Sequence, residues 1–339
     1  MTDDMFGYEA VDVDDDAALD ELAAEISQDD MDAAEASATV KKPAKEDDLQ
    51  LGFMGGDMGK PVKPPYWITP VAECQGMVKR QHTLVSTFSG CGGASLGFRM
   101  DGWRVLYVNE FIEAARESYL ANFPDTLMDP RDIREVTADD ILEKIGREKG
   151  DVDVLEGSPP CASFSMAGKR EKAWGEVKAY SDTKQRVDDL FWEFARVVEG
   201  VQPRIFVAEN VPGLLIGTAR PILKAIMQRL RDAGYAVSGR ILEAQWLGVP
   251  QRRRRLILQG IRRDLVDAGH RHAFPDPLPY TYTIRDALPW VVRLKSDAHG
   301  YFPGMDKDAG DHPAPTIMTQ SESGALYHHE VEVVRPVAI

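Results

Sequence analysis

The stretch TLVSTFSGCGGASLGF, residues 83–98, decides the fold class that we expect for this chain. It begins with an apolar, β-branched run at residues 83–88, which is typical of a buried strand. A glycine-rich turn, SGCGG, and a helix-forming segment follow directly. Such strand–turn–helix units cradle nucleosides and dinucleotides, because small residues let the backbone approach the ligand and the helix N-terminus offers N–H groups. Alone, this motif is a weak indicator of function.

Strand and helix patterns alternate along the chain that follows. Further strands are expected at residues 104–109, 152–155, 204–208, 236–242 and 254–260, and helices at residues 112–122, 138–148, 187–198 and 221–233. Alternation at this spacing predicts an α/β fold with a doubly wound, mostly parallel sheet.

Two acidic residues fall where such a fold binds a nucleoside. Glu110 ends the second expected strand, about 20 residues past the glycines, where a carboxylate accepts hydrogen bonds from ribose hydroxyls. Asp132 lies in the next loop, and by itself it is equally well explained as a helix cap.

A second stretch, GSPPCASFS at residues 157–165, follows the expected strand at 152–155. Pro159 and Pro160 fix two successive φ angles and place Cys161 at the carboxyl end of that strand, where open α/β sheets keep their reacting groups. The Cys161 thiolate is then a candidate nucleophile. The alternative is a small buried side chain, which is a common role of a free cysteine.

Charged residues near the later strands suggest partners for this thiol. Glu209 and Asn210 follow the strand at 204–208, on the rim that Cys161 shares, so a carboxyl group would lie near the thiol. In QRRRRLIL, residues 251–258, alternation sends Arg253 and Arg255 to one face of a strand and the other two arginines to the opposite face. The segment after Cys161 is rich in lysine and arginine with interleaved aromatics, which indicates phosphate contacts or, alternatively, an ordinary solvated loop.

Composition divides the chain and limits its class. Residues 1–50 hold 17 acidic residues and 3 lysines, whereas the remaining residues hold 38 acidic and 37 basic ones, so the net charge of −15 is concentrated in a tail. We expect residues 1–60 to be mostly disordered, with one short amphipathic helix near Leu19, and residues 61–82 to be a proline-rich linker. We expect no membrane span, no export signal, no disulfide framework and no metal site.

The motifs occur together in one order: FSGCGG, Glu110, Asp132, PPC at 159–161, ENV at 209–211, and Q-x-R-x-R beginning at Gln251. In this respect residues 83–260 resemble the cytosine-5 DNA methyltransferases. The resemblance implies a Rossmann-like, S-adenosylmethionine-dependent methyltransferase sheet as the catalytic domain. It also implies double-stranded DNA as partner and methylation of cytosine carbon 5 through a covalent cysteine adduct on a flipped base.

The resemblance also implies the site residues. Expected catalytic residues are Cys161, Glu209, Arg253 and Arg255. Expected contacts to S-adenosyl-L-methionine are Phe88, Ser89, Gly90, Cys91, Gly92, Gly93, Glu110, Phe111, Asp132, Ile133, Pro160 and Leu190. Expected DNA contacts are Ser165, Lys169, Arg170, Lys172, Arg186 and Gln251.

Two features depart from the family pattern. The interval that holds the target-recognition domain is about 55 residues here, so we expect residues 261–339 to form a reduced recognition region and a truncated C-terminal segment. The final family motif, which carries Gly-Asn, is absent before Ile339. A second chain supplying it, a body that works without it, and an inactive remnant or subunit of a split enzyme are the open explanations. RNA, such as transfer RNA, is the alternative substrate, and the expected location is the cytoplasm and nucleoid of a bacterium or phage-infected cell.

Overall fold

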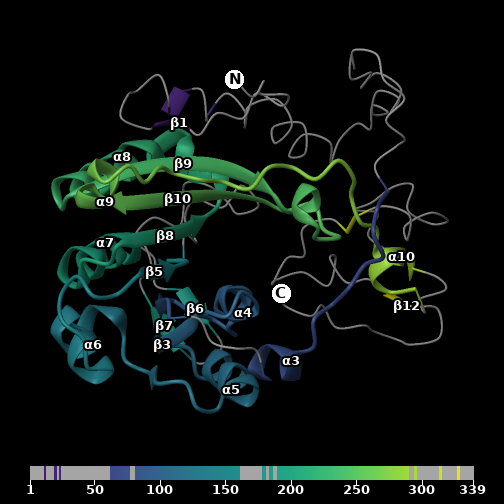
Figure 1. Cartoon of the computed structure of the whole chain (residues 1–339), viewed down its shortest axis with the longest axis horizontal. Coiled ribbons are helices and arrows are strands. Elements are labelled where there is room, and N and C mark those ends of the chain that lie inside the picture. Colours follow the sequence, from purple (N-terminus) through teal and green to yellow (C-terminus); the bar gives the residue numbers. More distant parts are fainter. Residues whose placement is uncertain are drawn as a thin grey trace. The chain divides into compact units, whose positions relative to one another are not determined.

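The computed structural model describes residues 62–76, 81–160, 189–289 and the short pieces 11–12, 19–20, 23, 178–180, 183–185, 294–295, 313–314 and 327–328. The chain forms two compact units (Figure 1). The first comprises Met1–Glu25, Thr69–Leu242 and Arg255–Phe274. The second comprises Ile26–Ile68, Glu243–Arg254 and Pro275–Ile339.

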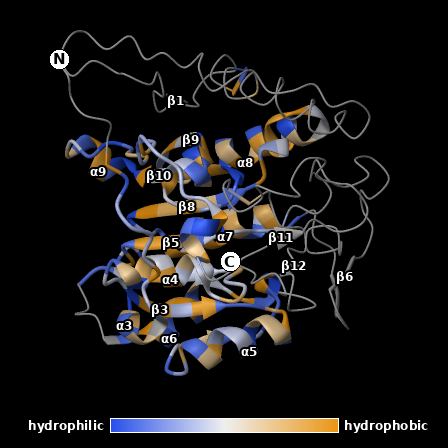
Figure 2. Ribbon diagram, turned by 90° about the vertical axis from the view of Figure 1, so that its right-hand side faces the viewer, coloured by the Kyte–Doolittle hydropathy of each residue, from blue (hydrophilic) through white to orange (hydrophobic). Residues whose placement is uncertain are grey.

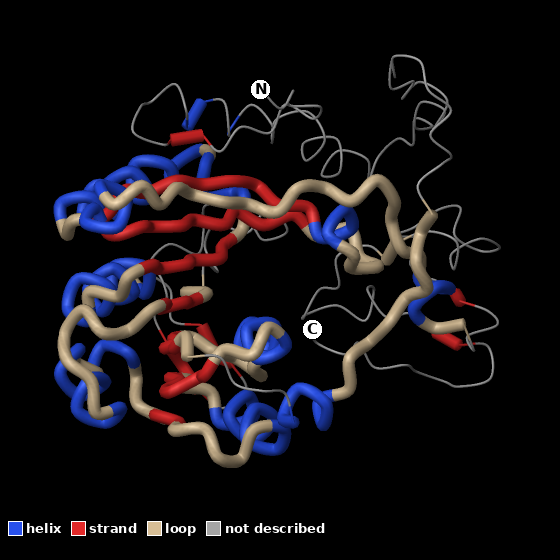
Figure 3. Tube along the Cα trace, viewed as in Figure 1, coloured by secondary structure: helices blue, strands red, loops and turns tan. Residues whose placement is uncertain are grey.

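The first unit is built on an eight-stranded sheet of order β1-β9-β10-β8-β5-β2-β3-β4 (Figure 3). Strands β8, β5, β2, β3 and β4 are parallel to one another, and β10 runs antiparallel to β8. This arrangement confirms the predicted α/β class with a mostly parallel sheet. The strands are β1 Val11–Asp12, β2 Thr83–Thr87, β3 Arg104–Asn109, β4 Met128–Asp129, β5 Val154–Gly157, β8 Ile205–Asn210, β9 Tyr235–Glu243 and β10 Arg254–Arg262, with a separate ladder of β6 Lys178–Tyr180 and β7 Thr183–Gln185.

Helices cover both faces of this sheet, as a doubly wound fold requires. Helices α6, α7 and α8 lie in a row along one face, while α4 and α5 lie on the other (Figure 1). Figure 2 shows mostly apolar central strands and helices that mix apolar and polar residues, and the buried positions of α7 and α8 are apolar. The helices are α3 Val71–Gly76, α4 Gly93–Met100, α5 Glu113–Asn122, η2 Ile133–Glu135, α6 Ala138–Ile145, α7 Leu190–Val201, η3 Pro212–Leu215, η4 Gly217–Ala219, α8 Arg220–Asp232 and α9 Arg263–Asp267.

Local signals explain where several elements start and end. Thr137 and Asp140 form a capping box that begins α6, and Gly146, with φ 62°, ends it three residues earlier than the pattern predicts. Strands β5 and β8 each extend beyond the apolar runs at 152–155 and 204–208, so Gly157 and Asn210 are still ladder residues. The hydrophobic pattern did not predict these last strand residues, because they are not apolar.

The edge of the sheet is covered by the start of the chain. Val11 and Asp12 pair with Gly239 and Ser238 of β9, and Leu19 is only 4% exposed. Asp20 forms an ion pair with Arg220 at the start of α8. Pairing a sheet edge in this way removes a template for association with other chains. Most of the predicted disordered tail lies outside the described residues.

In the second unit, the proline-rich segment packs against a short helix. Its elements are η5 Ala244–Leu247, α10 Ile284–Ala287, β11 Leu294–Lys295 and β12 Tyr327–His328. The Tyr282 hydroxyl donates to the Pro64 carbonyl at 3.0 Å, and its ring meets Tyr66 edge-on. Lys63 pairs with Asp286 at 2.7 Å. Within the described residues, no helix has the length and apolar character to cross a membrane, and no three acidic, histidine or cysteine side chains are grouped as metal ligands.

One ionisable side chain is enclosed within the sheet. Glu156 of β5 is 4% exposed and accepts a hydrogen bond from the Ser86 hydroxyl of β2, the residue it pairs with across the ladder. Burial raises the pKa of Glu156 to about 7; the Ser86 hydrogen bond opposes this shift, and the charge of nearby Glu209 adds to it. The carboxyl group is therefore largely protonated below neutral pH.

We expect the folded state to lose stability as pH rises, because Glu156 titrates near pH 4.3 when unfolded and near 7 when folded. The folded protein holds the extra proton between these values, so this contribution is complete below about pH 4 and is lost as pH rises through 7. The loss is on the order of 1–3 kcal/mol. Urea unfolding of wild type and Glu156→Gln at pH 5 and pH 8 measures it. An equal pH dependence in both proteins would contradict the assignment.

We also expect Gly260→Ala to destabilise the first unit by about 1–3 kcal/mol or more. A Cβ atom at Gly260 would lie 1.8 Å from Cε1 of Phe206, whose ring packs edge-on against Phe194 and Tyr235. The matched control is Gly97→Ala in α4, where a Cβ atom meets nothing within 4 Å. That substitution should raise stability by up to about 1 kcal/mol, since alanine is the better helix former. Thermal unfolding compares the two variants, and equal effects would show that packing at Phe206 is not the cause.

Candidate functional site

The glycine-rich turn is held in an unusual backbone conformation. Phe88, Gly90 and Gly92 all have positive φ, of 54°, 54° and 95°. This conformation is costly for a phenylalanine and is concentrated at functional sites. Gly92 has a second constraint, because a Cβ atom there would lie 2.8 Å from the Tyr119 ring of α5. The turn therefore leads from the carboxyl end of β2 into α4 with its backbone packed closely against α5.

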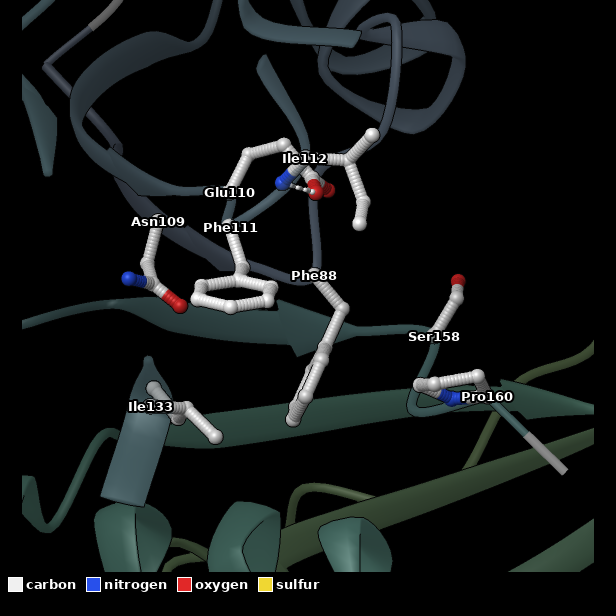
Figure 4. Close-up of a pocket in the computed structure, with 8 residues that line it drawn as sticks. All are labelled: Phe88, Asn109, Glu110, Phe111, Ile112, Ile133, Ser158 and Pro160. Atoms are coloured by element: carbon white, nitrogen blue, oxygen red, sulfur yellow. Dashed lines mark hydrogen bonds between the residues drawn. The ribbon is translucent and has the colours of Figure 1, made fainter. Parts of the chain in front are cut away.

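Glu110 fixes this turn from the neighbouring strand. Its carboxylate accepts the N–H of Gly90 at 2.8 Å through one oxygen. The other oxygen accepts the N–H of Ile112 at 2.7 Å, the bond dashed in Figure 4. Each oxygen of a carboxylate has two lone pairs, so these bonds do not exhaust its capacity to accept hydrogen bonds. The residue thus joins the ends of β2 and β3 and still presents an anionic acceptor.

A cavity of about 180 Å³ lies beside this carboxylate. It gathers residues from the ends of β2, β3 and β5 and from η2, with the Phe88 and Phe111 rings among them (Figure 4). Its lining includes five of the predicted cofactor contacts and three residues that the sequence did not single out. The former are Phe88, Glu110, Phe111, Ile133 and Pro160, and the latter are Asn109, Ile112 and Ser158. These three adjoin predicted residues in the chain, which is the signal that could have found them.

The other predicted cofactor residues are not among those that line this cavity. Ser89 and Gly92 are buried, Gly90 is half-buried, and Cys91 and Gly93 are exposed. Leu190 is buried as the first residue of α7. The carboxylate of Asp132 accepts the backbone N–H and the guanidinium of Arg134, and it caps η2. The structure therefore confirms the cap interpretation of Asp132, and its contact with the cofactor stays a prediction.

An ionic cluster around the buried Asp129 supports the loop that carries Asp132. Asp129 is 1% exposed and accepts hydrogen bonds from Tyr107, Arg131 and Lys144. Burial alone would raise the pKa of Asp129, but these hydrogen bonds outweigh it and hold the pKa well below its usual range. Burial and the Asp129 charge raise the pKa of Tyr107 well above its ordinary value. The Asn109 amide completes the support by donating to the Asp129 and Arg131 carbonyls at 3.2 and 2.9 Å.

The predicted catalytic acid, Glu209, lies on β8, between β5 and β10. Glu209 of β8 pairs with Arg255 of β10, with Oε1 and Nε 2.6 Å apart. Ala208 stands opposite Gly157 of β5, so Glu209 adjoins the start of the PPC stretch. The Asn210 amide donates to the Pro159 carbonyl at 3.1 Å within the buried interior. The ENV segment thus holds the chain two residues before Cys161.

The remaining predicted residues divide into two groups. Gln251 and Arg253 belong to the second unit, where Gln251 is buried and forms a bridge with Ala314, and the Arg253 carbonyl accepts the Ala244 N–H at 2.9 Å. The nucleophile and most predicted DNA contacts lie outside the described residues; they are Cys161, Ser165, Lys169, Arg170, Lys172 and Arg186.

Comparison with known proteins identifies the family. The profile of the C-5 cytosine-specific DNA methylases matches residues 82–300. The chain is 32% identical to the type II methyltransferase M1.HphI of Haemophilus parahaemolyticus over 76% of this chain and 65% of that protein. It is 35% identical to M.AquIA of a Picosynechococcus strain over 57% of this chain and 75% of that protein. A crystal structure of a putative DNA modification methyltransferase from an E. coli prophage aligns with TM-score 0.49 and 26% identity, covering 61% of this chain and 54% of that one.

The chain spans about half to two thirds of the length of most curated relatives that it matches. The profile nonetheless covers more than half of this chain and includes the turn, the acids and the arginine strand. The chain therefore belongs to the family of C-5 cytosine-specific DNA methylases, whose cofactor is S-adenosyl-L-methionine.

Proposed function

We propose that this chain transfers a methyl group from S-adenosyl-L-methionine to carbon 5 of cytosine in double-stranded DNA, through a covalent adduct with Cys161. The observation that carries the proposal is the Glu209–Arg255 pair beside β5, together with the Asn210 bond to Pro159. These contacts set a carboxyl group and a guanidinium next to the chain that leads to the thiol. The cavity lined by Pro160 supplies a neighbouring place for the cofactor.

The residues of the cavity fit this cofactor. Glu110 is an anionic acceptor suited to ribose hydroxyls, and Phe88 and Phe111 offer aromatic surface suited to adenine. Ile133 and Ile112 add apolar contact around the base. The bound cofactor supplies an electrophilic methyl group on a sulfonium centre. Removing the Glu110 carboxylate would therefore loosen both the ribose site and the turn that Gly90 forms.

The proposed chemistry follows from the poor nucleophilicity of cytosine carbon 5. Attack of the Cys161 thiolate on carbon 6 breaks the 5,6 double bond and makes carbon 5 enamine-like, so that it can accept the methyl group. Glu209 would hold ring nitrogen 3 and the exocyclic amine, which offsets charge developing on the ring. Loss of the carbon-5 proton to a base then re-forms the double bond and expels the thiolate.

The substrate must leave the base stack to reach Cys161, since carbon 6 is inaccessible to a side chain inside a duplex. We infer that Arg253 and Arg255 serve the base pocket, and that the basic residues between 165 and 186 together with Gln251 contact DNA. The place of action would then be the nucleoid of a bacterial cell.

The test is incubation of the protein with labelled S-adenosylmethionine and duplex DNA. Wild type should label the DNA, Cys161→Ser should abolish transfer, and Glu209→Gln should slow it about 10²–10⁴-fold. DNA containing 5-fluorocytosine should trap wild type covalently, because fluorine cannot leave as the proton does. Cys74→Ala is the matched control, since this buried thiol of α3 has no place in the proposed chemistry.

The outcomes separate the alternatives. Label in transfer RNA but not in DNA would move the same chemistry to an RNA substrate. Cofactor binding without transfer to either would favour a subunit that requires a second chain. Transfer by Cys161→Ser at the wild-type rate would reject the covalent mechanism.

A further inference from the structure

Arg134 lies between η2, whose Ile133 lines the cavity, and the N-terminus of helix α7, and the proposed reaction assigns it no role. Its backbone N–H and its Nη1 donate to Asp132 at 3.0 and 2.9 Å. Its Nε and Nη2 donate to the two carboxylate oxygens of Asp189 at 3.0 and 2.5 Å. Asp189 lies 55 residues further along the chain and is the N-cap of α7. One guanidinium thus joins two carboxylates on separate elements.

A second arginine also connects η2 and α7, but its side chain comes from α7 and binds η2. Arg196 of α7 donates through Nη2 to the carbonyls of Ile133 and Val136, at 2.8 and 2.9 Å. These carbonyls bracket η2, the turn whose Ile133 side chain lines the cavity. Because the turn is held to α7 at both ends, a shift of α7 at its first residue would move the cofactor-lining turn.

The geometry of these bonds suits Arg134 to transmit a movement of α7 to η2. A planar guanidinium that donates two parallel bonds to one carboxylate fixes both distance and orientation, which a lysine would not do. The Asp189 hydrogen bonds, with the nearby Asp132 charge, raise the pKa of Arg134 against the opposing effect of burial. Loss of the guanidinium would remove the cation that these two carboxylates share.

We infer that Arg134 is a positioning residue that couples cofactor binding to the N-terminus of α7, so that Asp189, which does not line the cavity, sets cofactor affinity. The inference rests on the proposed function only in taking the cofactor as the ligand. By linkage, the coupling works in both directions: the bound cofactor also stabilises the first turn of α7. The backbone N–H groups of Trp192 and Glu193 report on this turn, because both donate to the Asp189 carbonyl.

The experiment measures binding of S-adenosylhomocysteine, the demethylated cofactor, by calorimetry, so that no turnover is needed. Arg134→Gln and Asp189→Asn should each weaken binding about five- to tenfold. The double variant should bind no more weakly than Arg134→Gln alone, because both substitutions break one connection. The matched control is Arg229→Gln, which removes the 2.8 Å ion pair between Arg229 of α8 and Glu199 near the end of α7. This variant should leave affinity unchanged.

Hydrogen exchange distinguishes coupling from a general structural role. The bound ligand should slow exchange of the Trp192 and Glu193 amides in wild type and in Arg229→Gln, but not in Arg134→Gln. Asp189→Asn, at a half-exposed side chain, keeps the test valid if the arginine variant fails to fold. Wild-type affinity in Asp189→Asn, or additive losses in the double variant, would overturn the inference. Failure of wild type to bind S-adenosylhomocysteine would instead overturn the proposed function, and the inference with it.

Discussion

Close approach of β2, β5 and α7 at Gly157 is the constraint on which the rest of the site depends. A Cβ atom at this position would lie 2.5 Å from the Thr87 hydroxyl oxygen and 2.8 Å from the Phe194 ring. With no side chain there, β5 runs to its end in register with both Thr87 and Ala208. The glycine-rich turn after β2, the PPC stretch after β5 and the ENV segment of β8 consequently begin at the same level, at the carboxyl ends of their strands.

Polar groups buried near this edge serve to fix positions. Glu110 joins the turn to β3, Asn210 joins β8 to the PPC stretch, and the Asp129 cluster holds the loop that leads to η2. Each group forms hydrogen bonds to another element of the fold. These bonds compensate for the hydration that the group loses on burial, and they fix the relative positions of the two elements. Glu156 differs, because the Ser86 hydroxyl that it binds is neutral and the proton that Glu156 retains compensates for its burial.

The adjoining strands β5 and β8 therefore carry two carboxyl groups, one that titrates near neutral pH and one held in an ion pair. Glu156 and Glu209 occupy the same face, since Val207 stands opposite Glu156 and Glu209 follows two residues later. Glu209 forms an ion pair with Arg255. Among the described residues, the ion pairs include none that involves Glu156. Two carboxyl groups on adjoining strands are thus held in different environments by the strands that carry them.

The sequence by itself determined the fold class, the family and the order of the motifs. Apolar runs marked the strands, and the glycine turn with Glu110 marked the part of the fold where the structure has a cavity, because these signals are local in the chain. It misplaced the ends of β5, β8 and α6, where polar strand residues and a glycine cap overrode the periodicity. Only the tertiary structure decided that Asn210 holds Pro159, that Ser86 faces Glu156, and that Arg134 joins Asp132 to Asp189. Those contacts join residues 50 or more positions apart, and no local pattern specifies which distant side chain a strand register or a helix packing will bring within hydrogen-bonding distance.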